Sequence, residues 1–247
     1  MFANRTNRTT QLAAVTQQSS IDILRGLSFP LPGEAEFPGP PAMPSALLRL
    51  ELSLSAFVID LRDITDIIRS DVGLTVQLLR LAATETDQSS GKTGAINEIA
   101  VQVGVDGLEA LLVQTKSLPH LFSTHAGISA CERFWLHSRL TALIAEELAS
   151  QSSEVSSEEA YLAGLLCHVG ELSSVLGLAP PSSSPADSRH IGYRMAKAWG
   201  LPGALADVIG GYREICHSPE SRALLDIAEA ADNWASRLEC LAVHCAI

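Results

Sequence analysis

The chain has 247 residues, with 28 acidic and 17 basic side chains and a formal net charge of −11. Apolar residues make up 47 % and charged residues 18 %, a balance that excludes wholesale disorder, and this length can bury a sizeable core. The acid excess argues against a surface built for DNA or RNA, because phosphate binding relies on clustered Lys and Arg. We therefore expect no nucleic-acid partner.

The first 20 residues are polar and rich in Asn, Thr and Gln, without the apolar region of a signal peptide. We predict a disordered tail over residues 1–20. The longest apolar runs reach only about eight residues, whereas a membrane span needs about 20. The five cysteines are irregularly spaced and form no Cys-x-x-Cys pair, which is typical of reduced thiols. These features predict a cytoplasmic protein without a membrane partner.

Helical periodicity dominates the chain. Apolar positions between Phe57 and Ile68 recur on one helix face, and Asp71 suits the N-cap of a following helix that carries Leu74 to Leu81. Two longer helical patterns extend from about 96 to 113 and from about 132 to 149. No window shows the alternation of a strand bounded by hairpin turns, so we predict an all-α fold made of short helices.

The second half of the chain contains clear helix boundaries. Ser156 with Glu159 is typical of a capping box that opens a helix over 158–166. The sequence Trp199-Gly200-Leu201-Pro202 predicts a helix end followed directly by a new helix. Ser218-Pro219-Glu220 predicts the start of the last helix.

Burial preferences predict the environment of other side chains in these helices. Trp135, Trp199 and Trp234 fall on apolar faces and are expected in the core. The paired acids Glu146-Glu147 and Glu158-Glu159 are expected on solvated faces.

Five sequence blocks resemble a known family. The block from Ala163 to Leu172 (Ala-Gly-Leu-Leu-Cys-His-Val-Gly-Glu-Leu) resembles the HD superfamily of metal-dependent phosphohydrolases, whose signature there is Leu-Leu-His-Asp-Ile-Gly-Lys-Leu. The other four blocks narrow the resemblance to the HDOD (HD-related output domain) branch, found in bacterial signalling proteins. They are Pro41-Ala42-Met43-Pro44 with Leu47-Leu48-Arg49-Leu50, Ile67–Thr75 with Leu78–Ala82, Ile96–Val105, and His190 through Trp199-Gly200-Leu201-Pro202. The resemblance covers about residues 41–235.

This resemblance implies a compact, multi-helix HDOD-like domain over residues 21–247. Within it we expect an N-terminal helical part over 21–128 and an HD-like helical part over 129–247.

In HD enzymes a histidine, an adjacent His-Asp pair and a distant aspartate hold one or two metal ions. The resemblance places His137 at the first histidine and Asp232 at the last aspartate, with His190 at an auxiliary position. The central pair here is Cys167-His168, so the carboxylate that bridges two metals is absent. The family's following lysine is replaced as well, by a glutamate.

The candidate pocket residues are His137, Cys167, His168, His190 and Asp232. We favour a degenerate pocket with no catalytic residue, no metal and no cofactor, in which Cys167 is a small buried apolar side chain. The alternative is that His137, Cys167 or His168, His190 and Asp232 still hold a divalent transition metal.

The function that the resemblance implies is a non-catalytic bacterial signal-transduction module, which binds a signalling protein partner or a small ligand. One alternative is a metal-dependent phosphohydrolase that acts on a nucleotide or cyclic dinucleotide through a non-standard metal site. Another is a helical scaffold that only assembles with itself. The partners considered for the signalling module also include a second copy of the chain, in a homodimer.

Overall fold

The structure is a computed structural model that describes residues 39–85, 95–118, 125–175, 185–211 and 218–245. In these ranges the chain forms helices and loops, with one isolated bridge between Ala42 and Ser117. The predicted all-α fold is therefore confirmed, whereas the predicted tail over 1–20 lies outside the described residues. In chain order the helices are α2 (Pro44–Leu54), α3 (Leu61–Arg69), α4 (Val72–Glu85), α5 (Ile96–Gln114), α6 (His125–Ser150), α7 (Ser157–Leu166), the 3-10 turn η1 (Val169–Glu171), α8 (Leu172–Val175), α9 (Pro185–Ala198), α10 (Gly203–Gly210) and α11 (Pro219–Cys245).

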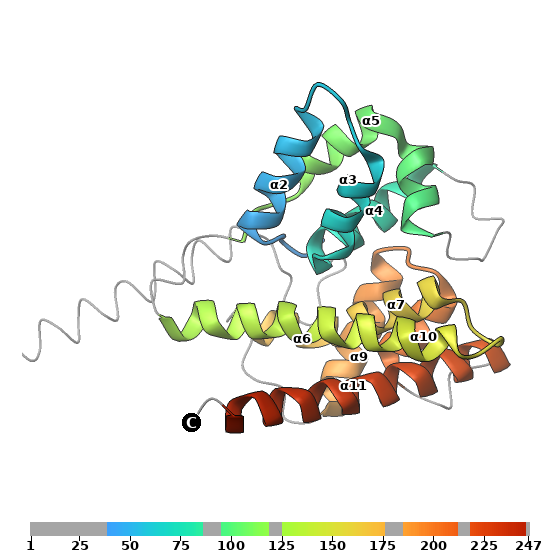
Figure 1. Cartoon of the computed structure of the whole chain (residues 1–247). Coiled ribbons are helices and arrows are strands. Elements are labelled where there is room, and N and C mark those ends of the chain that lie inside the picture. The colour runs from blue at the N-terminus through green and yellow to red at the C-terminus, as the bar shows by residue number, and fades with distance from the viewer. Residues whose placement is uncertain (1–38, 86–94, 119–124, 176–184, 212–217, 246–247) are drawn as a thin grey trace, which may run out of the picture.

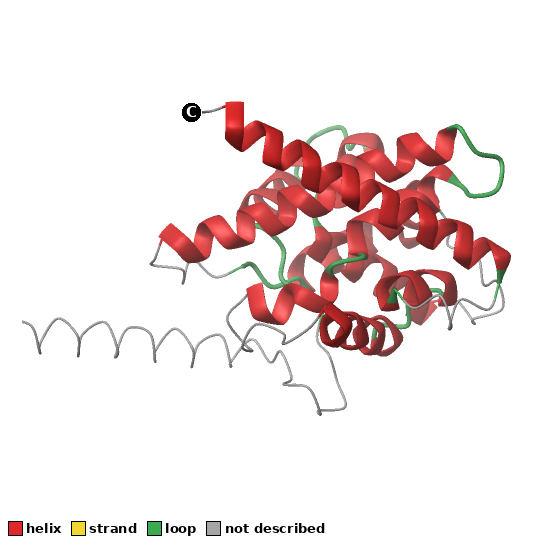
Figure 2. Cartoon of the chain, turned by 90° about the horizontal axis from the view of Figure 1, so that it is seen from below, coloured by secondary structure: helices red, strands yellow, loops and turns green. Residues whose placement is uncertain are grey.

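Helices α2 to α5 form one group and helices α6 to α11 form another (Figure 1). The two longest helices, α6 and α11, lie side by side in both views (Figures 1 and 2), and α7 packs against both of them. A continuous apolar core joins the two groups, with fully buried leucines and isoleucines from each. Its largest fully buried members include Leu50, Ile64, Leu74, Leu162 and Leu166.

Asp71 connects three helices from a fully buried position. Its Oδ1 accepts a 2.9 Å hydrogen bond from the backbone N–H of Leu74, which makes it the predicted N-cap of α4. Its Oδ2 accepts two further 2.9 Å hydrogen bonds, from the backbone N–H of Met43 before α2 and from Nε1 of Trp135 on α6. The carboxylate thus satisfies donors from both groups of helices.

Arg69, the last residue of α3, also joins the two groups. Its guanidinium donates to Glu146 of α6 at 2.7 Å and lies 3.5 Å from Glu158 of α7. It stacks 4.1 Å from the ring centroid of Tyr161, whose hydroxyl donates to the Arg69 carbonyl at 2.7 Å. The prediction that the paired acids lie on solvated faces is therefore wrong for Glu146 and Glu158, because a distant arginine draws both into an interhelical contact.

We expect Arg69→Ala to lower the free energy of unfolding by about 1–2 kcal/mol, because it removes a half-buried charged hydrogen bond and a stacking contact. Denaturant unfolding measures this loss. The control is Arg62→Ala on the exposed face of α3, for which we expect a change within about 0.5 kcal/mol. Equal losses in the free energy of unfolding for the two substitutions would show that the contacts of Arg69 do not stabilise the packing of the two groups of helices.

The predicted helix boundaries hold with local differences. Gly200 has φ of +68° and follows α9, as the sequence predicted, and Pro202 is the N-cap residue of α10. The Ser218 hydroxyl accepts a 3.0 Å hydrogen bond from the Ser221 N–H at the start of α11. Ser156 is the N-cap residue of α7, but its side chain makes no capping hydrogen bond, so the predicted capping box does not form.

Two predictions of burial are wrong. The helix predicted to include Phe57 begins only at Leu61, and Phe57 is fully exposed in the preceding turn. Trp135 and Trp199 are buried as expected, but Trp234 is 53 % exposed. It shares an outer face of α11 with Leu238, four residues further on, which is also exposed.

Candidate functional site

Three of the predicted site residues converge from three elements. His137 lies on α6, His168 follows the end of α7 and Asp232 lies on α11. The Nε2 atoms of the two histidines lie 3.0 and 3.1 Å from Oδ1 of Asp232 and 3.4 Å from each other. Side-chain exposure is 19 % for His137, 23 % for His168 and 35 % for Asp232, so the cluster is half-buried.

Each histidine also has a carboxylate at its other ring nitrogen. Nδ1 of His137 lies 3.0 Å from Oε1 of Glu239, and Nδ1 of His168 lies 3.6 Å from Oε1 of Glu171. Carboxylates and imidazoles thus alternate in the order Glu239, His137, Asp232, His168 and Glu171. Glu239 and Glu171 were not among the candidates predicted from the sequence.

The local sequence explains how these elements meet. Gly164 allows α7 to approach α6, because a Cβ there would lie 2.8 Å from both the Thr141 carbonyl oxygen and Cα of Ala142. Asp232 and Glu239 are seven residues apart on α11, which places them two turns apart on the same face.

The acidic partners shift the ionisation of the cluster. The hydrogen bond with Asp232 raises the pKa of His137 above its ordinary value of 6.5, and the nearby Glu239 adds to this shift. The Cys167 sulfur and the hydrogen bond with Asp232 raise the pKa of His168 well above 6.5, against the opposing effect of burial. Hydrogen bonds from both histidines hold the pKa of Asp232 well below 3.8.

These shifts predict a pH-dependent stability in protein kept free of metal with a chelator. A raised histidine pKa stabilises the folded state below pH 6.5, and this contribution is lost as the pH rises through the folded-state pKa. A lowered aspartate pKa contributes above pH 3.8 and is lost as the pH falls. We therefore expect Asp232→Asn to destabilise most at about pH 5–6 and least at about pH 9.

Denaturant unfolding across this pH range tests the prediction, with the exposed Asp66→Asn of α3 as the control. If the loss in free energy of unfolding caused by Asp232→Asn stayed constant with pH, the ion pairs between Asp232 and the histidines would not form.

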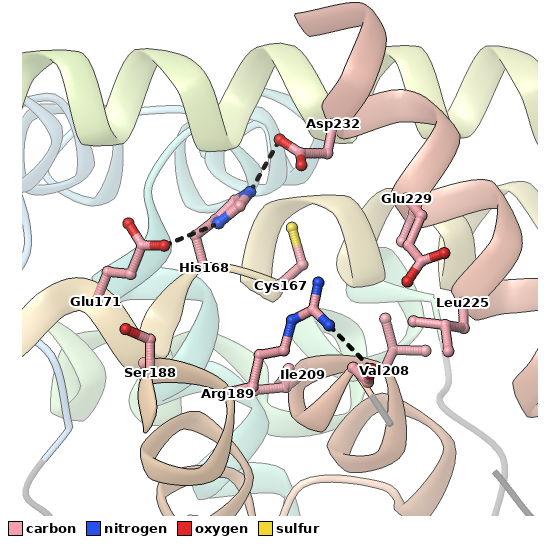
Figure 3. A pocket seen from close by; sticks show the side chains of 13 residues that line it. Cys167, His168, Glu171, Ser188, Arg189, Val208, Ile209, Leu225, Glu229 and Asp232 are labelled. Carbon is pink, nitrogen blue, oxygen red and sulfur yellow. Dashed lines mark hydrogen bonds and ion pairs between the residues drawn. The ribbon is translucent and has the colours of Figure 1, made fainter. Parts of the chain in front are cut away.

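A cavity of about 210 Å³ opens beside the cluster (Figure 3). Cys167 is half-buried in its wall and its Sγ donates to the Gly164 carbonyl at 3.2 Å, so the prediction of a buried apolar side chain is wrong. The side chain of Arg189, on α9, also lines the cavity, and its Nη1 donates a 3.3 Å hydrogen bond to the carbonyl oxygen of Gly211. The lining residues are Cys167, His168, Gly170, Glu171, Ser188, Arg189, Val208, Ile209, Gly211, Leu225, Ala228, Glu229 and Asp232.

His190 does not join the cluster. It is exposed on α9, and its neighbour Arg189 lines the cavity instead. Successive positions on a helix point about 100° apart. An error of one position in matching the motif is therefore enough to select a side chain that points away from the cavity. Among the described residues, the potential metal ligands whose ligand atoms all lie within 4.8 Å of one another are His137, His168 and Asp232.

These three atoms fit one divalent transition ion. A tetrahedral ion with bonds of about 2.0–2.1 Å separates its ligand atoms by about 3.3 Å, close to the 3.0, 3.1 and 3.4 Å found here. Two imidazoles and a carboxylate are ligands that such ions accept. When bound, an ion of this kind polarises a coordinated water. A second ion does not fit the cluster in the same way, because His168 offers no bridging carboxylate and both Nδ1 atoms face glutamates.

Comparisons with known proteins agree with this architecture. A family model for the HDOD domain matches residues 41–183. An uncharacterized protein of Treponema pallidum (strain Nichols) is 25 % identical in an alignment of 201 positions, and the match covers 73 % of this chain but only 39 % of that relative. The crystal structure of the MmoQ response regulator from Methylococcus capsulatus str. Bath is similar with a TM-score of 0.63 and 16 % identity, covering 83 % of this chain and 89 % of that one. The chain belongs to the HDOD domain family.

Proposed function

We propose that this protein is a non-catalytic regulatory module of bacterial signal transduction, which binds a signalling protein partner or a small ligand and passes that state on. The observation that carries the proposal is the position of His168. Its imidazole contacts Asp232 at the place where HD enzymes, by the resemblance described above, have their bridging carboxylate.

The chemistry of a two-metal site supports this proposal. Two ions that share an attacking hydroxide need a ligand that can bind both, and a carboxylate with two oxygens does so. An imidazole presents its two nitrogens in opposite directions, and Nδ1 of His168 already faces Glu171.

The charge of the chain and the name of a similar structure favour a regulatory role. A net charge of −11 suits a basic protein surface better than a nucleic acid. The structurally similar MmoQ protein bears the name response regulator. No helix in the described ranges is long and apolar enough to cross a membrane.

A phosphohydrolase acting on a nucleotide or cyclic dinucleotide is the second candidate function. The convergence of His137, His168 and Asp232 favours it, because a single bound ion could activate water there. Hydrolysis assays on a panel of nucleotides and cyclic dinucleotides, each with added Mg²⁺, Mn²⁺ or Zn²⁺, separate the two functions. We expect the wild type to hydrolyse these substrates no faster than His137→Ala does. Turnover by the wild type that is lost in His137→Ala would refute the proposal.

The scaffold alternative has its own test. Light scattering over a range of protein concentrations distinguishes a defined monomer or homodimer from progressive assembly. We expect a single species whose mass does not grow with concentration beyond a dimer.

A further inference from the structure

Glu239 and Glu171 each face the Nδ1 atom of one histidine in the cluster. Glu239 approaches Nδ1 of His137 from α11 at 3.0 Å, and Glu171 approaches Nδ1 of His168 from η1 at 3.6 Å. In both rings Nε2 then faces Oδ1 of Asp232. The loss of the bridging carboxylate does not explain why both rings are held in this orientation.

We propose that Glu239 and Glu171 are positioning residues, which hold the Nε2 atoms of His137 and His168 ready to bind one ion of the Zn²⁺ or Co²⁺ class together with Asp232. This inference deepens the proposed function by naming the ligand of its site. It requires binding and no turnover.

The first support is the proton that each histidine must keep. A histidine that binds a metal through Nε2 carries its proton on Nδ1, and a carboxylate that accepts this proton fixes both the tautomer and the orientation of the ring. Glu239 is placed to do this for His137, at the distance of an ordinary charged hydrogen bond. Glu171 is further from His168 and should contribute less.

The second support is the composition of the ligand set. Two nitrogens and one oxygen converge here, whereas Mg²⁺ and Ca²⁺ require mainly oxygen ligands. The imidazole of His168 therefore shifts the preference of the site toward ions that bind nitrogen well. The same change that removes a two-metal centre produces a site for one softer ion.

The third support is what such an ion would connect. Its three ligands come from α6, from the turn after α7 and from α11, so a bound ion would join the two longest helices to the wall of the cavity. A ligand that binds only the folded arrangement stabilises it. Occupancy of the site is thus linked to the stability of this helical group.

The test is a titration of the full chain, stripped of metal with a chelator, with Co²⁺ followed by its visible absorption. We expect one Co²⁺ per chain, displaced by Zn²⁺ but not by an equal concentration of Mg²⁺, and no binding to His137→Ala. Glu239→Ala should weaken Co²⁺ binding by about 10–100-fold, and Glu171→Ala by less. Glu239→Gln keeps an acceptor oxygen and should recover part of the loss.

The matched control is Glu220→Ala, which removes an exposed carboxylate from the first turn of the same helix, away from the cavity. It should leave the Co²⁺ affinity and spectrum unchanged, and circular dichroism establishes that every variant is folded. The inference is overturned if the wild type binds no Co²⁺, if Glu239→Ala binds Co²⁺ as well as Glu220→Ala does, or if Mg²⁺ displaces Co²⁺ as effectively as Zn²⁺ does. These outcomes leave the regulatory proposal standing, because that proposal depends on the absence of turnover.

Discussion

Replacing Asp71 with alanine is expected to lower the free energy of unfolding by about 3–5 kcal/mol, the largest loss that we predict for a single side chain. The carboxylate is fully buried and accepts hydrogen bonds from Met43, Leu74 and Trp135. Alanine would leave these donors without their acceptor and would remove the N-cap of α4. Denaturant unfolding monitored by Trp fluorescence and by circular dichroism measures the loss.

Two further variants make this prediction specific. Asp71→Asn keeps one acceptor oxygen but turns an NH2 donor toward one of these N–H groups, so its loss should lie between those of Asp66→Ala and Asp71→Ala. Asp66→Ala removes an exposed carboxylate from the neighbouring helix and should change stability by less than about 0.5 kcal/mol. If Asp71→Ala were no more destabilising than Asp66→Ala, the buried carboxylate would not hold the two groups of helices together.

Gly170→Ala is expected to cost about 3 kcal/mol, near the upper end for an overpacked contact. A Cβ on Gly170 would collide with the Ser188 carbonyl oxygen and would lie 2.9 Å from the Gly192 backbone nitrogen. Both obstacles are backbone atoms, so α9 itself would have to move away from η1. Since α9 also carries Arg189, the cavity beside His168 should change shape as well.

Thermal unfolding measures the stability loss of Gly170→Ala, and the matched control is Gly203→Ala. Nothing lies within 4 Å of a Cβ built on Gly203, so that variant should be nearly neutral. Equal melting temperatures for the two variants would contradict the close contact between η1 and α9.

Local chemistry made the helix boundaries predictable. The caps at Asp71 and Ser218 and the left-handed Gly200 depend on side chains or backbone angles within a few residues, so their signals are present in short segments. The family resemblance placed His137, His168 and Asp232 together, which neither spacing nor composition could have done. The structure adds the distances between them.

The features that were mispredicted depend on contacts between distant segments. Helical periodicity identifies an apolar face but not whether another helix covers it, so it predicts a buried Trp234, which the structure shows exposed. The sequence predicts a solvated Glu158, and this is wrong because its partner Arg69 lies on a distant helix that no local pattern reveals. Glu239 contacts a histidine 102 residues earlier, and its only local signal is the seven-residue spacing from Asp232.

The most direct test of a non-catalytic site is the difference in phosphoester hydrolysis between the wild type and His137→Ala. Both proteins are supplied in turn with Zn²⁺, Mn²⁺ and Mg²⁺ and assayed on the same nucleotides and cyclic dinucleotides. The regulatory proposal predicts no difference with any ion. Reproducible wild-type turnover that His137→Ala abolishes would contradict it and establish a phosphohydrolase in its place.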